Sequence, residues 1–500
     1  MLELKDLVSY VTMSRLRRLS FFYNLPKGKG TQLTALYHAI SNNEVADDDE
    51  ACTSLFGKKK DPRYAKVKHR LKKQLIDTVL LLEPKEKGQG DYHEIFTDLR
   101  KKLCVADVMR RQGRYNIVYD IVSKVCEKAK EAEMASLCLH SADLMMTYYL
   151  FGDYKTEKRN EYIDMARRYN HIYQAEVECH ASYHEFLEVV EDTKLSDKDR
   201  ASFALELLIR LDDSFPNVST IEYNSYYNTI KIAAKVYSAD YESVKKICSE
   251  QIELLVKKPV YPRAHVRNYL FQLINVSLPT KDFETGKAAY ERIIGIVDVG
   301  VRPWFRAKQL YIYLAIHTSD YKLAFDTCNN VMDHRKFKNQ QGEIRERFLL
   351  LRAYLSWLRE IGEIDTGEKK PRKFRLRRFL NEVPEFSKKK RRFNIPILVV
   401  QLLWVIIWEE YDEAEDRLRA LSRYTQRNNL RGTPGLERTN YFLKALAKLR
   451  SARFNRTRFE EKTSDLLDIL AENPSTVNPD AIEIEIVPYE TLYKLLLEQL

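Results

Sequence analysis

Two clusters of lysine and arginine are the residues of this chain whose type and spacing best suit a chemical role, the binding of anions. The first basic cluster, residues 58–73, holds nine Lys or Arg and one acidic residue, and the second basic cluster, residues 369–392, holds twelve and two. Their net charges are +8 and +10, and subtracting both from the chain's +11 leaves −7 for all other residues. This distribution predicts docking sites for a polyanion or an acidic protein on a mildly acidic body.

In the first basic cluster, cations share one face of a helix predicted over residues 62–82. The opposite, apolar face follows helical spacing through Tyr64, Val67, Leu71, Leu75 and Val79. The candidate binding residues are Lys66, Arg70 and Lys73. A basic helix after a compact helical domain has the geometry of a helix-turn-helix reader, which makes nucleic acid one hypothesis. A solvated helix face that binds nothing specific is the alternative.

The second basic cluster interleaves its cations with apolar residues such as Phe374 and Phe379, so part of it is expected to pack. Its candidate binding residues are Arg372, Lys373, Arg375, Arg377, Arg378, Lys388, Lys389, Lys390, Arg391 and Arg392. A net +10 within 24 residues is costly self-repulsion unless something offsets it. A phosphate backbone, an acidic protein or an acidic groove of the chain itself would do so, and a long solvated loop is the alternative interpretation.

No pattern of catalytic or metal-binding residues accompanies the two clusters. His180 and His184 lie four residues apart, a spacing that puts two zinc ligands on one helix face, but no third ligand is evident. Residues 27–31 resemble the end of a phosphate-binding loop, yet its first glycine is replaced by Tyr23. We find no Ser-His-Asp, Cys-His or paired-carboxylate arrangement. The sequence therefore predicts a protein that is not an enzyme and that holds no cofactor or metal.

The composition predicts that helices position these residues. Only 15 Gly and 15 Pro occur in 500 residues, which is typical of long helices with short connections. Seven scattered Cys without a CxxC pair indicate reduced thiols of a cytoplasmic protein. The most apolar run, residues 395–408, is shorter than the roughly 20 residues of a membrane span. We expect it to form a buried helix.

From residue 91 onward, one joint between helices recurs. A small or acidic residue precedes an aromatic residue, which begins a new amphipathic stretch. The joints are Gly113–Tyr115, Asp153–Tyr154, Asp240–Tyr241, Asp282–Phe283, Asp320–Tyr321 and Glu410–Tyr411. Two gaps are about twice the others, which predicts unmarked joints at residues 196–201 and near Gly362, and another joint is expected at 452–454. The resulting period, about 38–45 residues, is typical of helical-hairpin repeats.

The second helix of each unit places a small residue three positions after the aromatic one and apolar residues seven and ten positions after it. One unit shows this spacing as Tyr321, Ala324, Cys328 and Val331. The pattern resembles tetratricopeptide (TPR) repeats over roughly residues 91–470, although the units exceed 34 residues and lack the Trp-x-x-Leu-Gly signature. Residues 374–401 also resemble a stretch of bacterial TPR-like proteins without an established activity. The resemblance implies a right-handed superhelix of helical hairpins.

The predicted fold is therefore all-α, a TPR-like superhelix with a small helical N-terminal domain. Residues 1–83 form that basic domain, with helices over 2–22, 31–41 and 62–82 and a polar break at 42–50. Residues 84–90 form a linker, 91–470 the repeats with a basic insertion at about 362–394, and 471–500 a C-terminal cap. Within the cap, alternating Ile and Glu predict a strand over 481–487, and residues 489–499 predict a closing helix.

This organisation favours a non-enzymatic interaction scaffold that binds a peptide or helix of a partner protein. Its tyrosine-rich concave surface would supply contact area, and the two basic clusters would supply electrostatic recognition. The alternative is a nucleic-acid-associated regulator with a DNA- or RNA-binding N-terminal domain and a sensing solenoid. Neither hypothesis requires a small-molecule substrate.

Overall fold

The computed structural model describes residues 1, 4–5, 8, 32–42, 44–81, 91–192, 195–338, 340, 342–365, 367, 374–383, 394–427, 437–472 and 484–500. Over these residues the structure is helical and contains no strand, which confirms the all-α prediction. The chain divides into two compact units, residues 1–121 and 122–500. The predicted linker 84–90 and most of the helix predicted over 2–22 lie outside the described residues.

The first unit has a small core between α3 (Gln32–Ser41), α4 (Asp48–Phe56) and α5 (Pro62–Leu81); α6 (Tyr92–Arg111) follows. The apolar face predicted for α5 is confirmed, because Tyr64, Leu71 and Leu75 are buried and Val67 and Val79 pack against them. The predicted polar break was too long, since α4 begins within it. The Asp47 side chain accepts a hydrogen bond from the Glu50 backbone N–H, which caps this helix.

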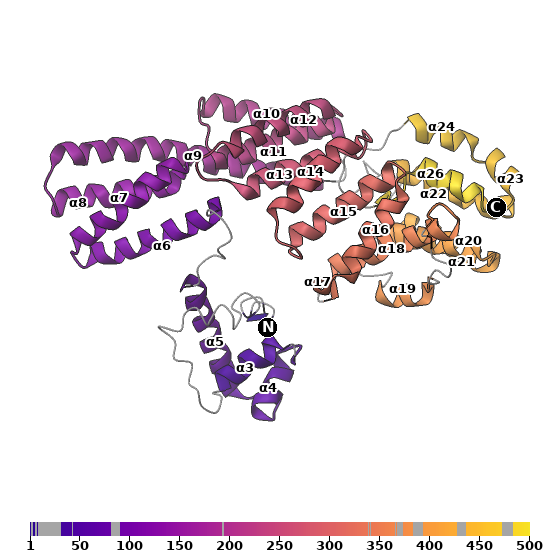
Figure 1. Ribbon diagram of the computed structural model, residues 1–500, viewed down its shortest axis with the longest axis horizontal. Coiled ribbons are helices and arrows are strands. Elements are labelled where there is room, and N and C mark those ends of the chain that lie inside the picture. The colour runs from indigo at the N-terminus through magenta and orange to yellow at the C-terminus, as the bar shows by residue number, and fades with distance from the viewer. Residues whose placement is uncertain are drawn as a thin grey trace. The chain divides into compact units, whose positions relative to one another are not determined.

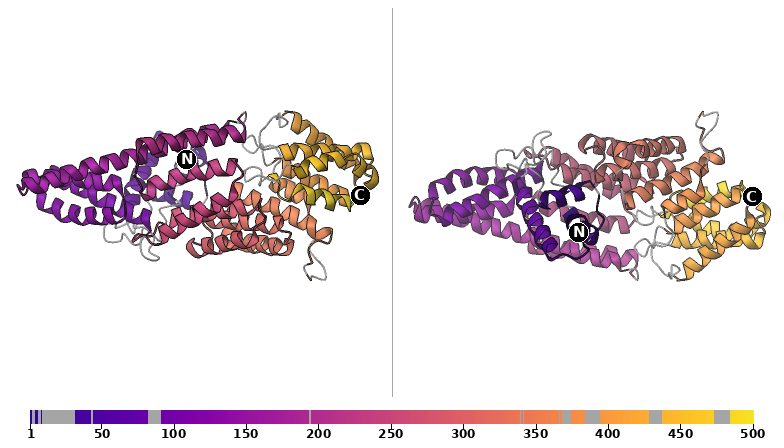
Figure 2. Two further views of the ribbon diagram at one scale, coloured as in Figure 1. Left: turned by 90° about the horizontal axis from the view of Figure 1, so that it is seen from above. Right: turned by 90° about the horizontal axis from the view of Figure 1, so that it is seen from below.

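The second unit is built of helices that pack in adjacent pairs (Figures 1 and 2). The bounds are α7 (Tyr115–Glu131, which begins in the first unit), α8 (Ala135–Phe151), α9 (Thr156–Glu191), α10 (Asp197–Ser214), α11 (Ile221–Tyr237), α12 (Tyr241–Val256), α13 (Arg263–Ser277), α14 (Phe283–Ile296), α15 (Arg302–His317), α16 (Tyr321–Asp333), α17 (Arg335–Lys338), α18 (Glu343–Glu360), α19 (Leu376–Glu382), α20 (Asn394–Ile407), α21 (Tyr411–Arg427), α22 (Glu437–Ala452), α23 (Arg456–Glu461), α24 (Ser464–Glu472) and α26 (Tyr489–Leu497). Consecutive helices such as α13 and α14, or α15 and α16, lie against each other along the chain.

Most predicted joints are confirmed, and one turn geometry explains them. Helices begin at the aromatic residue of five joints, namely Tyr115, Tyr241, Phe283, Tyr321 and Tyr411. Two residues earlier the backbone is left-handed, as at Ser319 (φ 64°). The Asp320 N–H then donates to the Ala315 carbonyl oxygen at 2.8 Å, and the Asp320 side chain accepts from the Leu323 N–H. The left-handed residue therefore closes one helix at each of these joints, and at Asp240, Asp282 and Asp320 the aspartate also caps the next helix.

Other joints depart from the prediction. The Asp153–Tyr154 joint was wrong by two residues, because α9 begins at Thr156 and leaves Tyr154 exposed. That helix is 36 residues long, nearly the whole predicted period of about 38–45 residues. Ser196 does cap α10, through a reciprocal capping box with Asp199, and Gly362 ends α18 at φ 93°. At the 452–454 joint, the second helix is divided into α23 and α24.

The C-terminal segment packs on α22 without forming the predicted strand. Residues 484–487 are not extended, and residues 481–483 lie outside the described part of the chain. Glu485 is buried here, because its carboxylate pairs with Arg438 at 2.8 Å. Alternation of Ile and Glu was therefore misleading, since both faces of this segment are covered. The closing helix is confirmed as α26, where Tyr489 stacks on Phe442 at 4.3 Å.

The apolar run at residues 395–408 forms α20, whose residues 394–406 are all buried, as predicted. It is fastened to α18 by reciprocal tryptophan bonds: Trp357 Nε1 donates to the Leu403 carbonyl oxygen at 3.2 Å, and Trp404 Nε1 to that of Ala353 at 3.3 Å. These contacts hold α18 in place for the site described below. Among the described residues, no helix combines the length and apolarity needed to cross a membrane.

Candidate functional site

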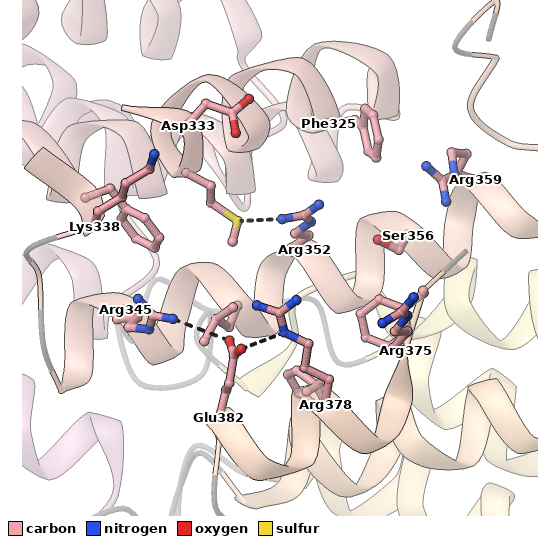
Figure 3. A pocket seen from close by; sticks show the side chains of 15 residues that line it. Phe325, Asp333, Lys338, Arg345, Arg352, Ser356, Arg359, Arg375, Arg378 and Glu382 are labelled. Atoms are coloured by element: carbon pink, nitrogen blue, oxygen red, sulfur yellow. Dashed lines mark hydrogen bonds and ion pairs between the residues drawn. The ribbon is translucent and has the colours of Figure 1, made fainter. Parts of the chain in front are cut away.

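A basic groove lies over α18, with α16 and α17 on one side and α19 on the other (Figure 3). The cavity has a volume of about 790 Å³. Six of its lining residues are cationic, namely Lys338, Arg345, Arg352, Arg359, Arg375 and Arg378. Its two acidic lining residues are Asp333 and Glu382, so the lining carries four more positive than negative charges.

Three of these cations form a column along α18. Arg345, Arg352 and Arg359 are seven residues apart, about two helical turns, and therefore share one side of the helix. Between them lie Leu349 and Ser356, which also line the groove. The other side of α18 is buried, so the helix presents its arginines from a fixed position.

The acids of the groove neutralise only part of this charge. The Glu382 carboxylate bridges two helices, accepting from Arg378 Nε at 2.9 Å and lying 3.5 Å from Arg345 Nη2. Arg352 contacts the Met332 sulfur at 4.0 Å. Within the part of the chain that the structure describes, no carboxylate lies within 4.0 Å of Arg352, Arg375 or Lys338.

Aromatic rings line both sides of the column. Phe325 of α16 lies under the Arg359 guanidinium, 5.7 Å from its carbon to the ring centre, in a cation–π arrangement. On the other side Phe374 stacks on Trp404 at 4.6 Å, which anchors the start of α19 to α20, and Phe379 adjoins it. Arginine guanidinium groups beside aromatic rings can bind the carboxylates or phosphates of a ligand that also has apolar groups.

The structure brings together part of the predicted second site and adds residues that we did not predict. Arg375 and Arg378 line the groove, whereas Arg377 is exposed outside it. The remaining candidates of this cluster, Arg372, Lys373, Lys388, Lys389, Lys390, Arg391 and Arg392, lie outside the described residues. The arginines of α18 were missed because they lie outside the two basic clusters, although their seven-residue spacing was visible in the sequence.

The first basic cluster forms an open helix face in the other unit. Lys66, Arg70 and Lys73 are exposed on α5, opposite its buried side. None of the three pairs with a carboxylate among the described residues. In contrast, Lys68 binds Asp48 at 2.8 Å and so supports the α4–α5 packing. This face can contact a polyanion, but nothing described encloses it.

The neighbours of His180 and His184 are typical of a structural contact and not of a metal site. The Nε2 atoms of His180 and His184 lie 3.0 Å apart, and His180 stacks on Tyr226. No group of three or more His, Cys, Asp or Glu side chains within the described ranges could hold a metal ion.

Six of the seven cysteines are buried and only Cys104 is exposed, and none forms a disulfide. Burial raises the pKa of the Cys248 thiol to about 12.

Comparisons with known proteins find no relative of this chain. No protein-family model matches it, and neither a curated protein nor a solved structure does. Its function is therefore argued from the basic groove and from the first basic cluster.

Proposed function

We propose that the chain is a non-enzymatic cytoplasmic scaffold, a TPR-like right-handed superhelix whose basic groove binds an acidic segment of a partner protein. The observation that carries the proposal is the arginine column of α18, which faces Arg375 and Arg378 across an aromatic-lined cavity. Arginine binds carboxylates through two parallel hydrogen bonds and is less strongly hydrated than lysine. An acidic partner would also relieve the repulsion between these cations.

A second candidate function is nucleic-acid binding through α5. Its support is the exposed face of Lys66, Arg70 and Lys73, which has no acidic partner among the described residues. Such a face suits the regular phosphates of a duplex, where affinity comes from displaced counterions. We rank it second because the groove offers enclosure and aromatic contact as well as charge.

Affinity capture tests the preferred function. The full chain and an Arg352→Glu/Arg375→Glu variant would be used as bait in nuclease-treated extract of the native host. We expect the variant to lose a defined set of proteins, because both reversals place negative charge in the groove. Arg377→Glu is the matched control, since Arg377 lies on α19, two residues after Arg375, but outside the groove. An unchanged set with the double variant would contradict the proposal, and a set captured only from a parallel extract without nuclease treatment would favour nucleic acid.

A further inference from the structure

The arginine column has a regular spacing that a bound segment must match. Arg345, Arg352 and Arg359 succeed one another at seven-residue intervals, about 10.5 Å of helix rise. Seven residues fall only about 20° short of two full turns, so the three positions stay nearly in line. A segment that carries one carboxylate about every 10 Å can therefore meet successive arginines.

Three backbone conformations meet this requirement differently. A partner α-helix rises about 10.5 Å in seven residues, so it would need an acid at every seventh position to match the column. In a β-strand three residues span about 10 Å, but positions i and i+3 point to opposite faces. In polyproline II three residues rise about 9.3 Å and complete one turn, so every third side chain lies on one edge.

The aromatic side walls of the groove can contact the other two edges of a polyproline II segment. Phe325 lies on one side of the column, and Phe374 and Phe379 lie on the other. When acidic residues of a polyproline II segment face α18, the two intervening positions of each turn face these rings. Aromatic-lined grooves bind proline-rich segments well, because the segment is already extended and loses little entropy.

Glu382 shows within the chain how the groove binds an acid. Its carboxylate lies between Arg345 on α18 and Arg378 on α19 (Figure 3). The next arginine of the column, Arg352, has no carboxylate within 4.0 Å in the described part of the chain. Glu382 therefore occupies one end of the row and leaves its middle open to an acid from outside.

We infer that the groove binds a proline-rich acidic segment in the polyproline II conformation, with Asp or Glu at every third position. Arg352 receives one acid, and a neighbouring acid competes with Glu382 for Arg345 and Arg378. This inference rests on the proposed function and adds to it the conformation and the spacing of the partner's acids.

Fluorescence anisotropy with the full chain tests the inference. The probes are a labelled peptide of four Glu-Pro-Pro repeats and an isomer of identical composition whose four Glu residues are contiguous. At low salt we expect the repeating peptide to bind about tenfold more tightly, because only its acids match the column. We expect Arg352→Gln to weaken its binding about three- to tenfold and Glu382→Gln to strengthen it about two- to fivefold. Arg377→Gln should leave it unchanged.

The possible results separate this inference from the proposed function. Equal affinity for the two peptides would overturn the inferred acid spacing and polyproline II conformation of the bound segment. If Arg352→Gln weakened the binding of both, the proposal that the groove binds an acidic partner would still stand. A preference that Glu382→Gln does not change would refute the competition by Glu382. Absence of binding by either peptide, with binding of labelled single-stranded DNA that Arg352→Gln weakens, would overturn both proposals in favour of a phosphate ligand.

Discussion

At the scale of residues, the second unit contains arginines of two kinds, one buried and paired with acids and the other exposed. Arg438 is largely buried, and its guanidinium donates to Glu485, Glu490 and the Leu470 carbonyl oxygen at 2.7–2.9 Å. A buried charge is tolerated only with such complete pairing, so Arg438 has a structural role. Arg352 is exposed to solvent and contacts the Met332 sulfur, and no carboxylate of the described residues lies within 4.0 Å of it. Arginines of the second kind remain available to a partner.

His317 is the residue from which we expect a distinctive pH dependence. It is buried at the end of α15, where Nε2–H donates to the Glu485 carbonyl oxygen at 3.2 Å. Burial, with smaller effects from Lys281 and Arg438, lowers the pKa of its imidazole to about 4. The folded protein therefore holds this imidazole neutral at pH values where the unfolded chain is protonated.

We predict that acidification from pH 6.5 towards 4 destabilises the second unit partly through His317. The unfolded chain binds a proton there that the folded chain excludes, so stability falls with pH across this window and this contribution levels off below about pH 4. At 1.36 kcal/mol per pKa unit the contribution is on the order of 3 kcal/mol. His317→Gln should flatten the pH dependence of the urea midpoint, followed by tryptophan fluorescence. The same slope in His317→Gln as in the wild type, with the exposed His69→Gln as control, would contradict this prediction.

At the scale of elements, the close approach of neighbouring helices depends on small residues. Gly286 lies in α14 three residues after Phe283, at the position where the repeat pattern calls for a small side chain. A Cβ there would lie 2.5 Å from Leu314 Cδ2 of α15 and 3.0 Å from Ser277 Cβ of α13. The glycine therefore allows α14 to contact both neighbours closely.

We predict that Gly286→Ala destabilises the second unit by up to about 2 kcal/mol. Alanine gains about 1 kcal/mol in helix propensity, but overpacking against α13 and α15 costs about 1–3 kcal/mol. Gly295→Ala in the same helix is the matched control, because a Cβ there meets no atom within 4 Å. It should be neutral or stabilising by up to about 1 kcal/mol. Equal urea midpoints for the two variants would show that α14 does not need the small residue.

At the scale of the whole molecule, the two basic surfaces belong to different compact units. The α5 face lies in residues 1–121 and the groove in residues 122–500. They also differ in kind, since one is an exposed helix face of lysine and arginine and the other is a groove with aromatic walls. We therefore expect them to act as separate binding sites for different ligands.

Charge reversal at each surface should separate the two activities. Lys66→Glu/Arg70→Glu/Lys73→Glu should reduce the binding of labelled duplex DNA, with a salt slope lowered by up to about three. It should leave the affinity for the Glu-Pro-Pro peptide unchanged, and Arg352→Glu should do the reverse. Anisotropy measured with both probes from about 50 to 300 mM salt checks this. Loss of both ligands in either variant would mean that the surfaces form one site.

Local features of this molecule could be predicted from sequence because neighbouring residues cause them. The turn before Tyr321 arises from a left-handed residue and an aspartate cap, all within three positions. The buried side of α5 follows from helical spacing, and the burial of α20 from a run of apolar residues. Hydrogen bonding and side-chain periodicity act over short stretches, so the sequence by itself determined the helices, most joints and the charged faces.

The binding groove was decided only by tertiary structure. Arg352 and Arg375 are separated by 23 positions in the chain, and nothing local indicates that α18 and α19 face each other across a cavity. Local sequence also did not indicate that Glu485 is buried beside Arg438, in a segment where we had predicted a strand. Burial and charge pairing between distant segments depend on how helices pack. The sequence therefore predicted where positive charge gathers, and packing determined which arginines share a site.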